Sequence, residues 1–174
     1  MKIAVVDDSK FTRMVIKQIL NDLSNTDFCW EAENGKVALE KNTRDPVDLI
    51  ISDLEMPVLD GLQLLKTVIG GEAKTNCLLV SAFHKANQPK IVDALKAGAI
   101  GFIEKNSLGK GFDINSLKKE IDKYINFLTQ DNILKKEIRA TSLENHLRKP
   151  VVKNRADFIS CLLYTSPSPR DKSS

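Results

Sequence analysis

The sequence lacks several features that would assign it to a large class of proteins. Nowhere in its 174 residues is there a run of about 18 apolar residues, so we expect no membrane-spanning helix. The first apolar run meets Asp7 and Asp8 after only four residues, which is unlike a secretory signal and favours a cytoplasmic protein. The three cysteines have neither metal-ligand spacing nor an even number for a disulfide framework.

The chain also lacks the aromatic residues and motifs that accompany basic segments in nucleic-acid-binding proteins. Residues 1–105 hold 13 basic and 15 acidic side chains, whereas residues 106–174 hold 13 and 8, so the net charge moves from −2 to +5. A basic half can indicate a nucleic-acid partner, but no interleaved aromatic residues or groove-reading motif accompany it. We therefore expect a solvated basic helix and no nucleic-acid or membrane partner.

What the chain does have is a regular alternation of short apolar runs and segments of helical period. This pattern predicts a doubly wound α/β fold, with five parallel strands in one sheet and helices on both faces. Ser9 is a candidate N-cap for the first helix, whose expected buried face is Phe11, Met14, Val15, Ile19 and Leu23. Trp30 is expected to pack on an edge strand. The expected strands are 2–6, 27–32, 47–52, 77–82 and 101–105, and the expected helices are 10–23, 36–41, 61–69, 88–99 and 113–128.

Polar residues follow four of the five predicted strands. The strand ends carry Asp7 and Asp8, Asp53, Ser81, and Lys105. Ligands of doubly wound sheets bind at the carboxyl ends of the strands, so these side chains should meet. Three carboxylates close together either raise a pKa or hold a hard cation such as Mg²⁺. A hydroxyl and an ammonium beside them suit the oxygens of a phosphoryl group.

Four sequence blocks carry a resemblance to a known family. They are VVDDS (5–9), DLEMPVLDG (53–61), VSA (80–82) and GFIEK (101–105). In their order and spacing, residues 1 to about 128 resemble the receiver domain of response regulators in two-component signalling. The resemblance implies a flavodoxin-like sheet and an aspartate that accepts phosphate from a histidine kinase.

The resemblance also implies a role for each matched acidic residue. Asp53 would be the phosphoacceptor. Asp8 and Asp53 would bind Mg²⁺ directly, Asp7 would bind it through water, and the backbone carbonyl of Glu55 would complete the protein ligands.

The remaining matched residues would serve the phosphoryl group and the switch. Ser81 would bond one phosphoryl oxygen and Lys105 another, while Ala82 would leave space for the group to enter. Phe102 occupies the aromatic switch position of the family, although it could also be an ordinary core residue. Phosphorylation would be read out on the face formed by the fourth helix, the fifth strand and the fifth helix.

The loop residues match the family with one departure. Pro57 and Gly61 are expected to shape the loop after the phosphoacceptor. The family usually places a proline after the active-site lysine, but here Asn106 follows Lys105. The geometry of the loop after the fifth strand therefore does not follow from the resemblance.

The receiver motifs are most similar to those of chemotaxis protein-glutamate methylesterases. In that family a linker and a catalytic domain with a glycine-rich serine motif follow the receiver, and no such motif occurs here. We expect residues 1–128 to form a receiver domain that is not itself an enzyme, followed by a helical extension at its C-terminus. Residues 129–160 would form a helical, basic linker toward a missing output domain. Residues 161–174, rich in Ser and Pro, would be a disordered tail derived from a sequencing adapter.

Three alternatives stay open at this point. A stand-alone receiver could act by docking a partner, without an output domain. A phosphohydrolase could also use an aspartate nucleophile and Mg²⁺, but such enzymes commonly carry a second aspartate where this chain has Glu55. A receiver-like protein without phosphorylation is disfavoured because every expected site residue is present.

Overall fold

The fold is that of a computed structural model, which describes residues 1–71, 74–82, 85–105 and 113–129. Strands and helices alternate from the N-terminus of this part to its end. The elements are β1 (Lys2–Val6), α1 (Lys10–Asn21), β2 (Asp27–Ala32), α2 (Gly35–Arg44), β3 (Leu49–Ser52), α3 (Gly61–Gly70), β4 (Asn76–Ser81), α4 (Gln88–Ala97), β5 (Gly101–Glu104) and α5 (Ile114–Thr129).

The five strands form one sheet in the order β2-β1-β3-β4-β5. All four neighbouring pairs are parallel. The predicted doubly wound parallel sheet is therefore confirmed. The order reverses direction between β1 and β3, so the carboxyl ends of these two central strands open onto the crevice where such folds bind ligands.

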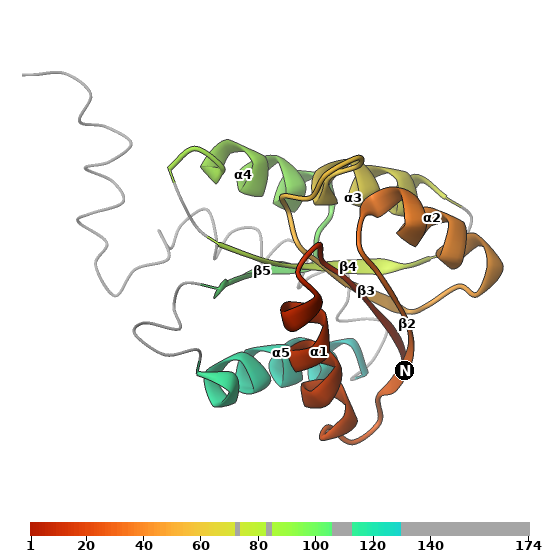
Figure 1. The fold of residues 1–174 in the computed structure, drawn as a ribbon, viewed down its shortest axis with the longest axis vertical. Coiled ribbons are helices and arrows are strands. Elements are labelled where there is room, and N and C mark those ends of the chain that lie inside the picture. Colours follow the sequence, from red (N-terminus) through yellow and green to blue (C-terminus); the bar gives the residue numbers. More distant parts are fainter. Residues whose placement is uncertain (72–73, 83–84, 106–112, 130–174) are drawn as a thin grey trace, which may run out of the picture.

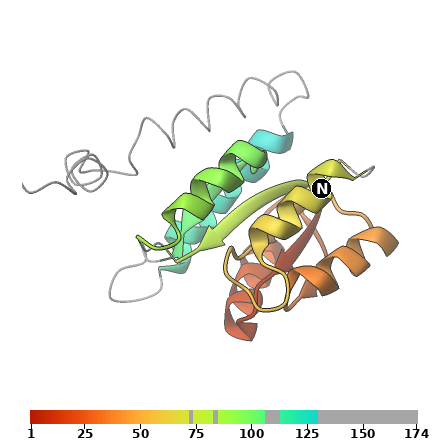
Figure 2. The same cartoon turned by 90° about the horizontal axis from the view of Figure 1, so that it is seen from above.

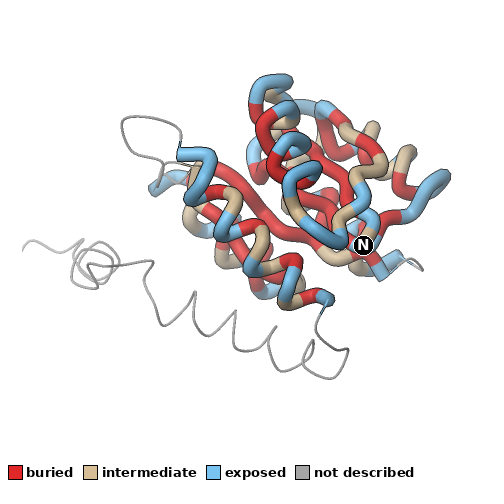
Figure 3. Tube along the Cα trace, turned by 90° about the horizontal axis from the view of Figure 1, so that it is seen from below, coloured by how far each residue is buried: buried red, intermediate tan, exposed pale blue. Residues whose placement is uncertain are grey.

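Helices cover both faces of the sheet, with α1 and α5 on one side and α2, α3 and α4 on the other (Figures 1 and 2), and alternate residues of β1 belong to the cores on the two sides. Ile3 and Val5 of β1 belong to a core shared with α1 and α5. Ala4 and Val6 belong to a core on the other face, shared with α2 and α3. A third cluster packs α3 and α4 against β4 and β5. Figure 3 shows the result as a buried sheet between helices whose outer sides are exposed.

Side-chain caps fix where several helices begin. The Ser9 hydroxyl accepts a hydrogen bond from the Thr12 amide at 3.3 Å, so the predicted N-cap of α1 is confirmed. Asn34 caps α2 in the same way. Asp60 and Gln63 form a reciprocal capping box at the start of α3. Each cap also fixes the loop that precedes its helix.

The buried face of α1 differs from the prediction. Phe11 and Met14 are each 57% exposed, whereas Ile16 and Leu20, which were not predicted, are buried with Val15 and Ile19. The helix therefore meets the sheet through a stripe rotated by about one residue from the predicted one. The spacing of apolar residues correctly predicted an amphipathic helix, but it did not identify which side of the helix faces the sheet.

The third strand begins two residues later than predicted. Val47 is buried, but its amide and carbonyl form hydrogen bonds with side chains and not with a neighbouring strand. Its amide donates to Asn42 Oδ1 at 3.1 Å, and its carbonyl accepts from the Thr75 hydroxyl at 2.9 Å. Periodicity cannot distinguish this arrangement from strand pairing. Trp30 packs on the edge strand β2 as predicted, and its indole donates to the Asp45 carbonyl.

Within the described residues, no helix is long and apolar enough to cross a membrane. The predicted helical extension, the linker at 129–160 beyond its first residue, and the tail at 161–174 lie outside the described residues, as does Asn106. Those expectations remain predictions.

Candidate functional site

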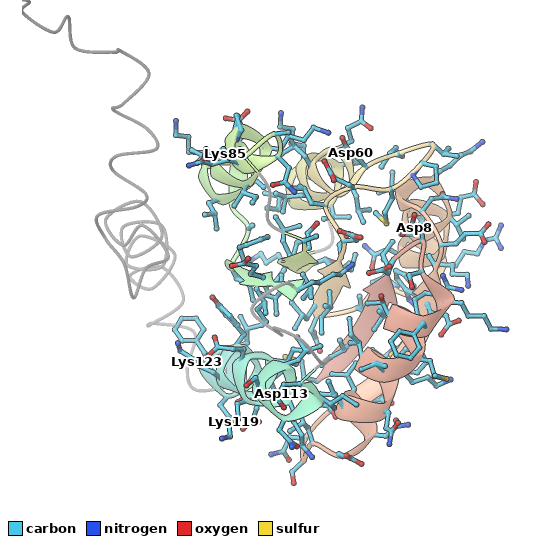
Figure 4. The ribbon with its side chains drawn as sticks, turned by 60° about the vertical axis from the view of Figure 1, so that its left-hand side comes forward. Asp8, Asp60, Lys85, Asp113, Lys119 and Lys123 are labelled. Carbon is cyan, nitrogen blue, oxygen red and sulfur yellow. The ribbon has the colours of Figure 1, made fainter. Side chains whose placement is uncertain are left out.

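The candidate site lies at the carboxyl ends of the central strands. Figure 4 shows the molecule turned toward this end, with Asp8 following β1, and Asp60, Lys85 and Asp113 preceding α3, α4 and α5. Because the sheet is parallel, every β-to-α loop of the fold meets here.

The first part of the site is the loop between β1 and α1. Asp7 extends the pairing of β1 by one residue, because its amide donates to the Ala32 carbonyl at 3.1 Å. Its carboxylate is buried, with the residue only 1% exposed, and Oδ1 accepts from the Ser9 amide at 2.9 Å. Asp8, the next residue, is exposed. One acid is therefore fixed inside the site and the second lies at its opening.

Asp53 follows β3 and is held in a similar way. Its amide donates to the Val6 carbonyl at 2.8 Å, and the residue is 8% exposed. Its Oδ1 accepts from the Leu54 amide at 2.6 Å and, at 3.4 Å, from the Glu55 amide. The Asp53 carbonyl lies against Gly61, where a Cβ would collide with it. The backbone thus fixes one carboxylate oxygen and leaves the other for a different partner.

That partner is Lys105, immediately after β5. Its Nζ donates to Asp7 Oδ2 at 2.7 Å and to Asp53 Oδ2 at 2.8 Å, and its side chain is 17% exposed. A single ammonium therefore bridges the acids at the ends of β1 and β3. The sequence predicted that Asp7, Asp53 and Lys105 would meet, and in the structure they are in direct contact.

Burial and neighbouring charges together shift the pKa values of Asp7 and Lys105. Burial raises the pKa of the Asp7 carboxyl, and Asp53 adds to this, while Lys105 and the Ser9 amide oppose it without reversing it. Burial alone would lower the pKa of Lys105, but Asp53 and Asp7 together outweigh that effect and raise it. Both directions mean that a proton is held more tightly at these two side chains than at their free counterparts.

The carboxylates of Asp7, Asp8 and Asp53 also fit a hard cation. An oxygen from each lies within 4.8 Å of an oxygen from each of the others. Ligands of an octahedral Mg²⁺ at 2.0–2.1 Å lie about 3 Å apart in adjacent positions and about 4 Å apart in opposite ones. The separation suits direct binding by Asp8 and Asp53 and leaves Asp7 close enough to bind through a water ligand, and carboxylates are donors that Mg²⁺ prefers. The donor set therefore suits the metal that the sequence predicted.

The other predicted residues surround this centre. Ser81 closes β4, the strand between β3 and β5, and is buried. Ala82 follows it and is half-buried. Phe102 on β5 is buried in the core cluster that includes Ile91 of α4. Their predicted contacts with a phosphoryl group, the switch role of Phe102, and metal binding by the Glu55 carbonyl stay predictions.

Two residues at the site were missed by the sequence analysis. Arg13 of α1 donates from Nη1 to the Asp7 carbonyl at 2.7 Å. Asn87, buried before α4, donates from Nδ2 to the Ala82 carbonyl at 2.6 Å. The position of Arg13 offered a signal, because it lies one helical turn after the predicted N-cap Ser9. Asn87 gave none, because nothing in its surroundings predicts a buried amide.

Comparisons with known proteins agree with this geometry. The family described as response regulator receiver domain matches residues 3–122. A protein-glutamate methylesterase/protein-glutamine glutaminase of Syntrophomonas wolfei is 33% identical over 152 residues, 87% of this chain and 41% of that protein. The chemotaxis protein CheY of Bacillus subtilis is 35% identical over 125 residues, 72% of this chain and 98% of CheY.

A solved structure of a response regulator domain has the same fold as this chain. The response regulator domain of Thermotoga maritima CheB superposes with a TM-score of 0.65 at 30% identity, covering 75% of this chain and 98% of that one. The chain thus spans less than half the length of the methylesterase that it matches, and nearly all of CheY and of the CheB receiver.

Proposed function

The chain belongs to the response regulator receiver family, and on that premise we propose that it accepts a phosphoryl group on Asp53 from a histidine kinase. The observation that carries the proposal is the Lys105 bridge between Asp7 and Asp53, beside a third carboxylate at the ends of the central strands. Such a centre joins a nucleophile, a cation and a metal-binding acid pair in one place.

The proposed reaction transfers a phosphoryl group from a phosphohistidine, the donor, to the Asp53 carboxylate, the acceptor. A carboxylate oxygen of Asp53 attacks the phosphorus of a phosphohistidine, the P–N bond breaks, and its electron pair returns to the imidazole. Lys105 stays within reach of the Asp53 carboxylate and neutralises charge on the transferred oxygens. The Ser81 hydroxyl donates to another of those oxygens.

Mg²⁺ is the proposed cofactor, held by Asp8 and Asp53 directly, by Asp7 through water, and by the Glu55 carbonyl. When bound, it supplies positive charge to the phosphoryl oxygens. The convergence of three carboxylates supports this proposal, because an oxygen from each of Asp7, Asp8 and Asp53 lies within 4.8 Å of the others.

The proposed signal output depends on Phe102, which is buried beside α4. We propose that Ser81 moves toward the phosphoryl group and that Phe102 turns into the space it leaves, which shifts a pre-existing equilibrium. The face formed by α4, β5 and α5 would then bind an output domain or a partner.

The similarity to chemotaxis proteins favours a cytoplasmic chemotaxis role. One relative is a methylesterase longer than this chain, and another is CheY, which the receiver fold nearly fills. We propose a methylesterase domain as the regulated output, with partner docking by a stand-alone receiver as the alternative.

Phosphorylation can be tested directly by intact-mass measurement. Incubation with Mg²⁺ and acetyl phosphate should add the mass of one phosphoryl group, stable in acid and labile in base. Asp53→Asn should abolish the addition. Asp27→Asn, which removes an exposed carboxylate at the start of β2, should not. Persistence of the adduct in Asp53→Asn would show that the phosphoacceptor is a different residue.

The same experiment separates a receiver from a phosphohydrolase. A receiver incubated with excess phosphodonor accumulates an adduct of up to about one phosphoryl group per chain. A hydrolase with the same nucleophile would instead release inorganic phosphate over many turnovers without a stoichiometric adduct.

A further inference from the structure

Arg13 makes contacts that the proposed reaction does not use. It lies in the first turn of α1, where its amide donates to the Ser9 carbonyl at 3.1 Å, and its side chain is only 12% exposed. Its Nη1 donates to the Asp7 carbonyl at 2.7 Å and approaches the Asp8 carbonyl at 3.5 Å. Its Nε approaches Glu31 Oε1 on β2 at 3.4 Å.

These contacts complete the fixation of the Asp7 peptide unit. The Asp7 amide is bound to the Ala32 carbonyl, its Oδ1 is bound to the Ser9 amide, and its carbonyl is bound to Arg13. The carbonyl belongs to the peptide that joins Asp7 to Asp8. A rotation of that peptide would turn both carboxylates, so the guanidinium controls how the pair is presented.

We propose that Arg13 is a positioning residue for the cation site, holding the Asp7–Asp8 peptide so that both carboxylates converge with Asp53. The inference rests on the proposed function in one respect, namely that these acids bind Mg²⁺. It adds that the site depends on a side chain that contacts no reacting atom.

The sign of the effect separates positioning from simple electrostatics. A guanidinium behind the acid pair repels a divalent cation, so charge alone predicts that its removal strengthens Mg²⁺ binding. Positioning predicts the opposite, because a loosened peptide must be ordered again when the metal binds. Outer contacts that orient metal ligands typically contribute about 10- to 100-fold in affinity.

The test is an Mg²⁺ titration of the full chain followed by the backbone amide resonances of Asp8 and Asp53. Arg13→Met should weaken binding about tenfold. Lys17→Met is the matched control, because it removes one positive charge from the same helix at a side chain that lies over the Phe28 ring instead. Lys17→Met should leave the affinity nearly unchanged. Unchanged or tighter binding in Arg13→Met would overturn the inference.

A second variant and a metal-free measurement guard against loss of folding. Arg13→Lys keeps the charge and can reach one carbonyl, so it should recover part of the affinity, and it decides the question if Arg13→Met does not fold. Amide hydrogen exchange without metal should be faster for Ser9, whose N–H is bound to Asp7 Oδ1, in Arg13→Met but not in Lys17→Met. Equal Ser9 exchange in all variants would contradict positioning.

The wild-type titration separates a failure of the Arg13 inference from a failure of the proposed Mg²⁺ site. Saturable binding by the wild type with no effect of Arg13 substitution refutes the inference and leaves the proposed function intact. No saturable binding by the wild type refutes the metal site, and the inference with it.

Discussion

Lys105 is one ammonium facing a group of three carboxylates, so the metal-free site holds excess negative charge. Natural sites accept such strain where it serves binding, because a cation later relieves it. Asp7 is the most buried of the three, with 1% of the residue exposed, and burial raises its pKa. A stability measurement on this residue should therefore reveal the strain.

Asp7→Asn should raise the melting temperature of the metal-free protein near neutral pH. Because the folded-state pKa of Asp7 is raised, the folded protein binds a proton there more readily than the unfolded chain does. Wild-type stability from this group therefore increases as the pH falls through that raised pKa. The advantage of Asp7→Asn should shrink as the pH is lowered from about 7 toward about 4.5.

Thermal unfolding in the presence of a chelator at both pH values would measure this difference. Asp22→Asn, which alters an exposed carboxylate paired with Lys118, is the control and should show little difference at either pH. A lower melting temperature for Asp7→Asn at neutral pH would mean that the Lys105 bond outweighs the burial of the charge.

Among the elements, the loop between β3 and α3 packs closely against the backbone of the site. Its end, Gly61, begins α3 directly against the Asp53 carbonyl, and the Gly61 amide donates to the Leu54 carbonyl at 3.0 Å. A side chain here would displace the backbone that carries the phosphoacceptor.

Gly61→Ala should destabilise the fold by about 1–3 kcal/mol, the usual cost of overpacking, and should slow phosphorylation of Asp53. Gly70→Ala is the matched control at the other end of α3, where a Cβ would meet no atom within 4 Å. It should be neutral or stabilising by up to about 1 kcal/mol. Denaturant unfolding and the rate of acetyl phosphate labelling would measure both effects. Equal behaviour of the two variants would show that the close approach has no consequence.

The sequence predicted the elements well because their signals are local. The N-cap Ser9 and the alternation of strands and helices depend on neighbouring residues, and the structure confirms both. The failures involve contacts between distant segments. Val47 reads as strand, but Asn42 and Thr75 bind its peptide groups, and only the fold brings Thr75 there.

The candidate site was predictable to the same extent. The positions of Asp7, Asp53 and Lys105 at strand ends predicted that they would meet, because a parallel sheet gathers such ends at one edge. For Arg13, only its position one helical turn after Ser9 was a signal; its contact with the Asp7 carbonyl was not predictable, because that depends on the direction of one side chain. The same limit explains why Phe11 and Met14, expected in the core, are exposed.

At the scale of the whole molecule, the site joins four strands that are distant in the sequence. Asp7 and Lys105 are 98 residues apart, yet one ion pair links the end of β1 to the end of β5. These residues come together only when the entire sheet is formed, so the unfolded chain does not present the site. A ligand of these residues should therefore stabilise the fold as a whole.

Mg²⁺ should raise the melting temperature of the wild type progressively and without an early plateau. A ligand that binds only the folded state stabilises it by RT ln(1 + [L]/Kd), about 2.7 kcal/mol at 100 times Kd. For a domain of this size that corresponds to a rise on the order of 10 °C. Asp8→Asn removes an exposed carboxylate of the cluster and should leave the metal-free melting temperature nearly unchanged while abolishing most of the rise.

Differential scanning calorimetry at increasing MgCl₂, with NaCl matched for ionic strength, would measure this rise. Trp30 fluorescence is a poor alternative readout, because its indole is bound to the Asp45 carbonyl at the end of α2 and not to a residue of the site. The Asp8→Asn comparison identifies the source of the effect, because general screening by salt would stabilise both proteins equally. An equal rise in the two proteins would place the bound cation away from the acids at the strand ends.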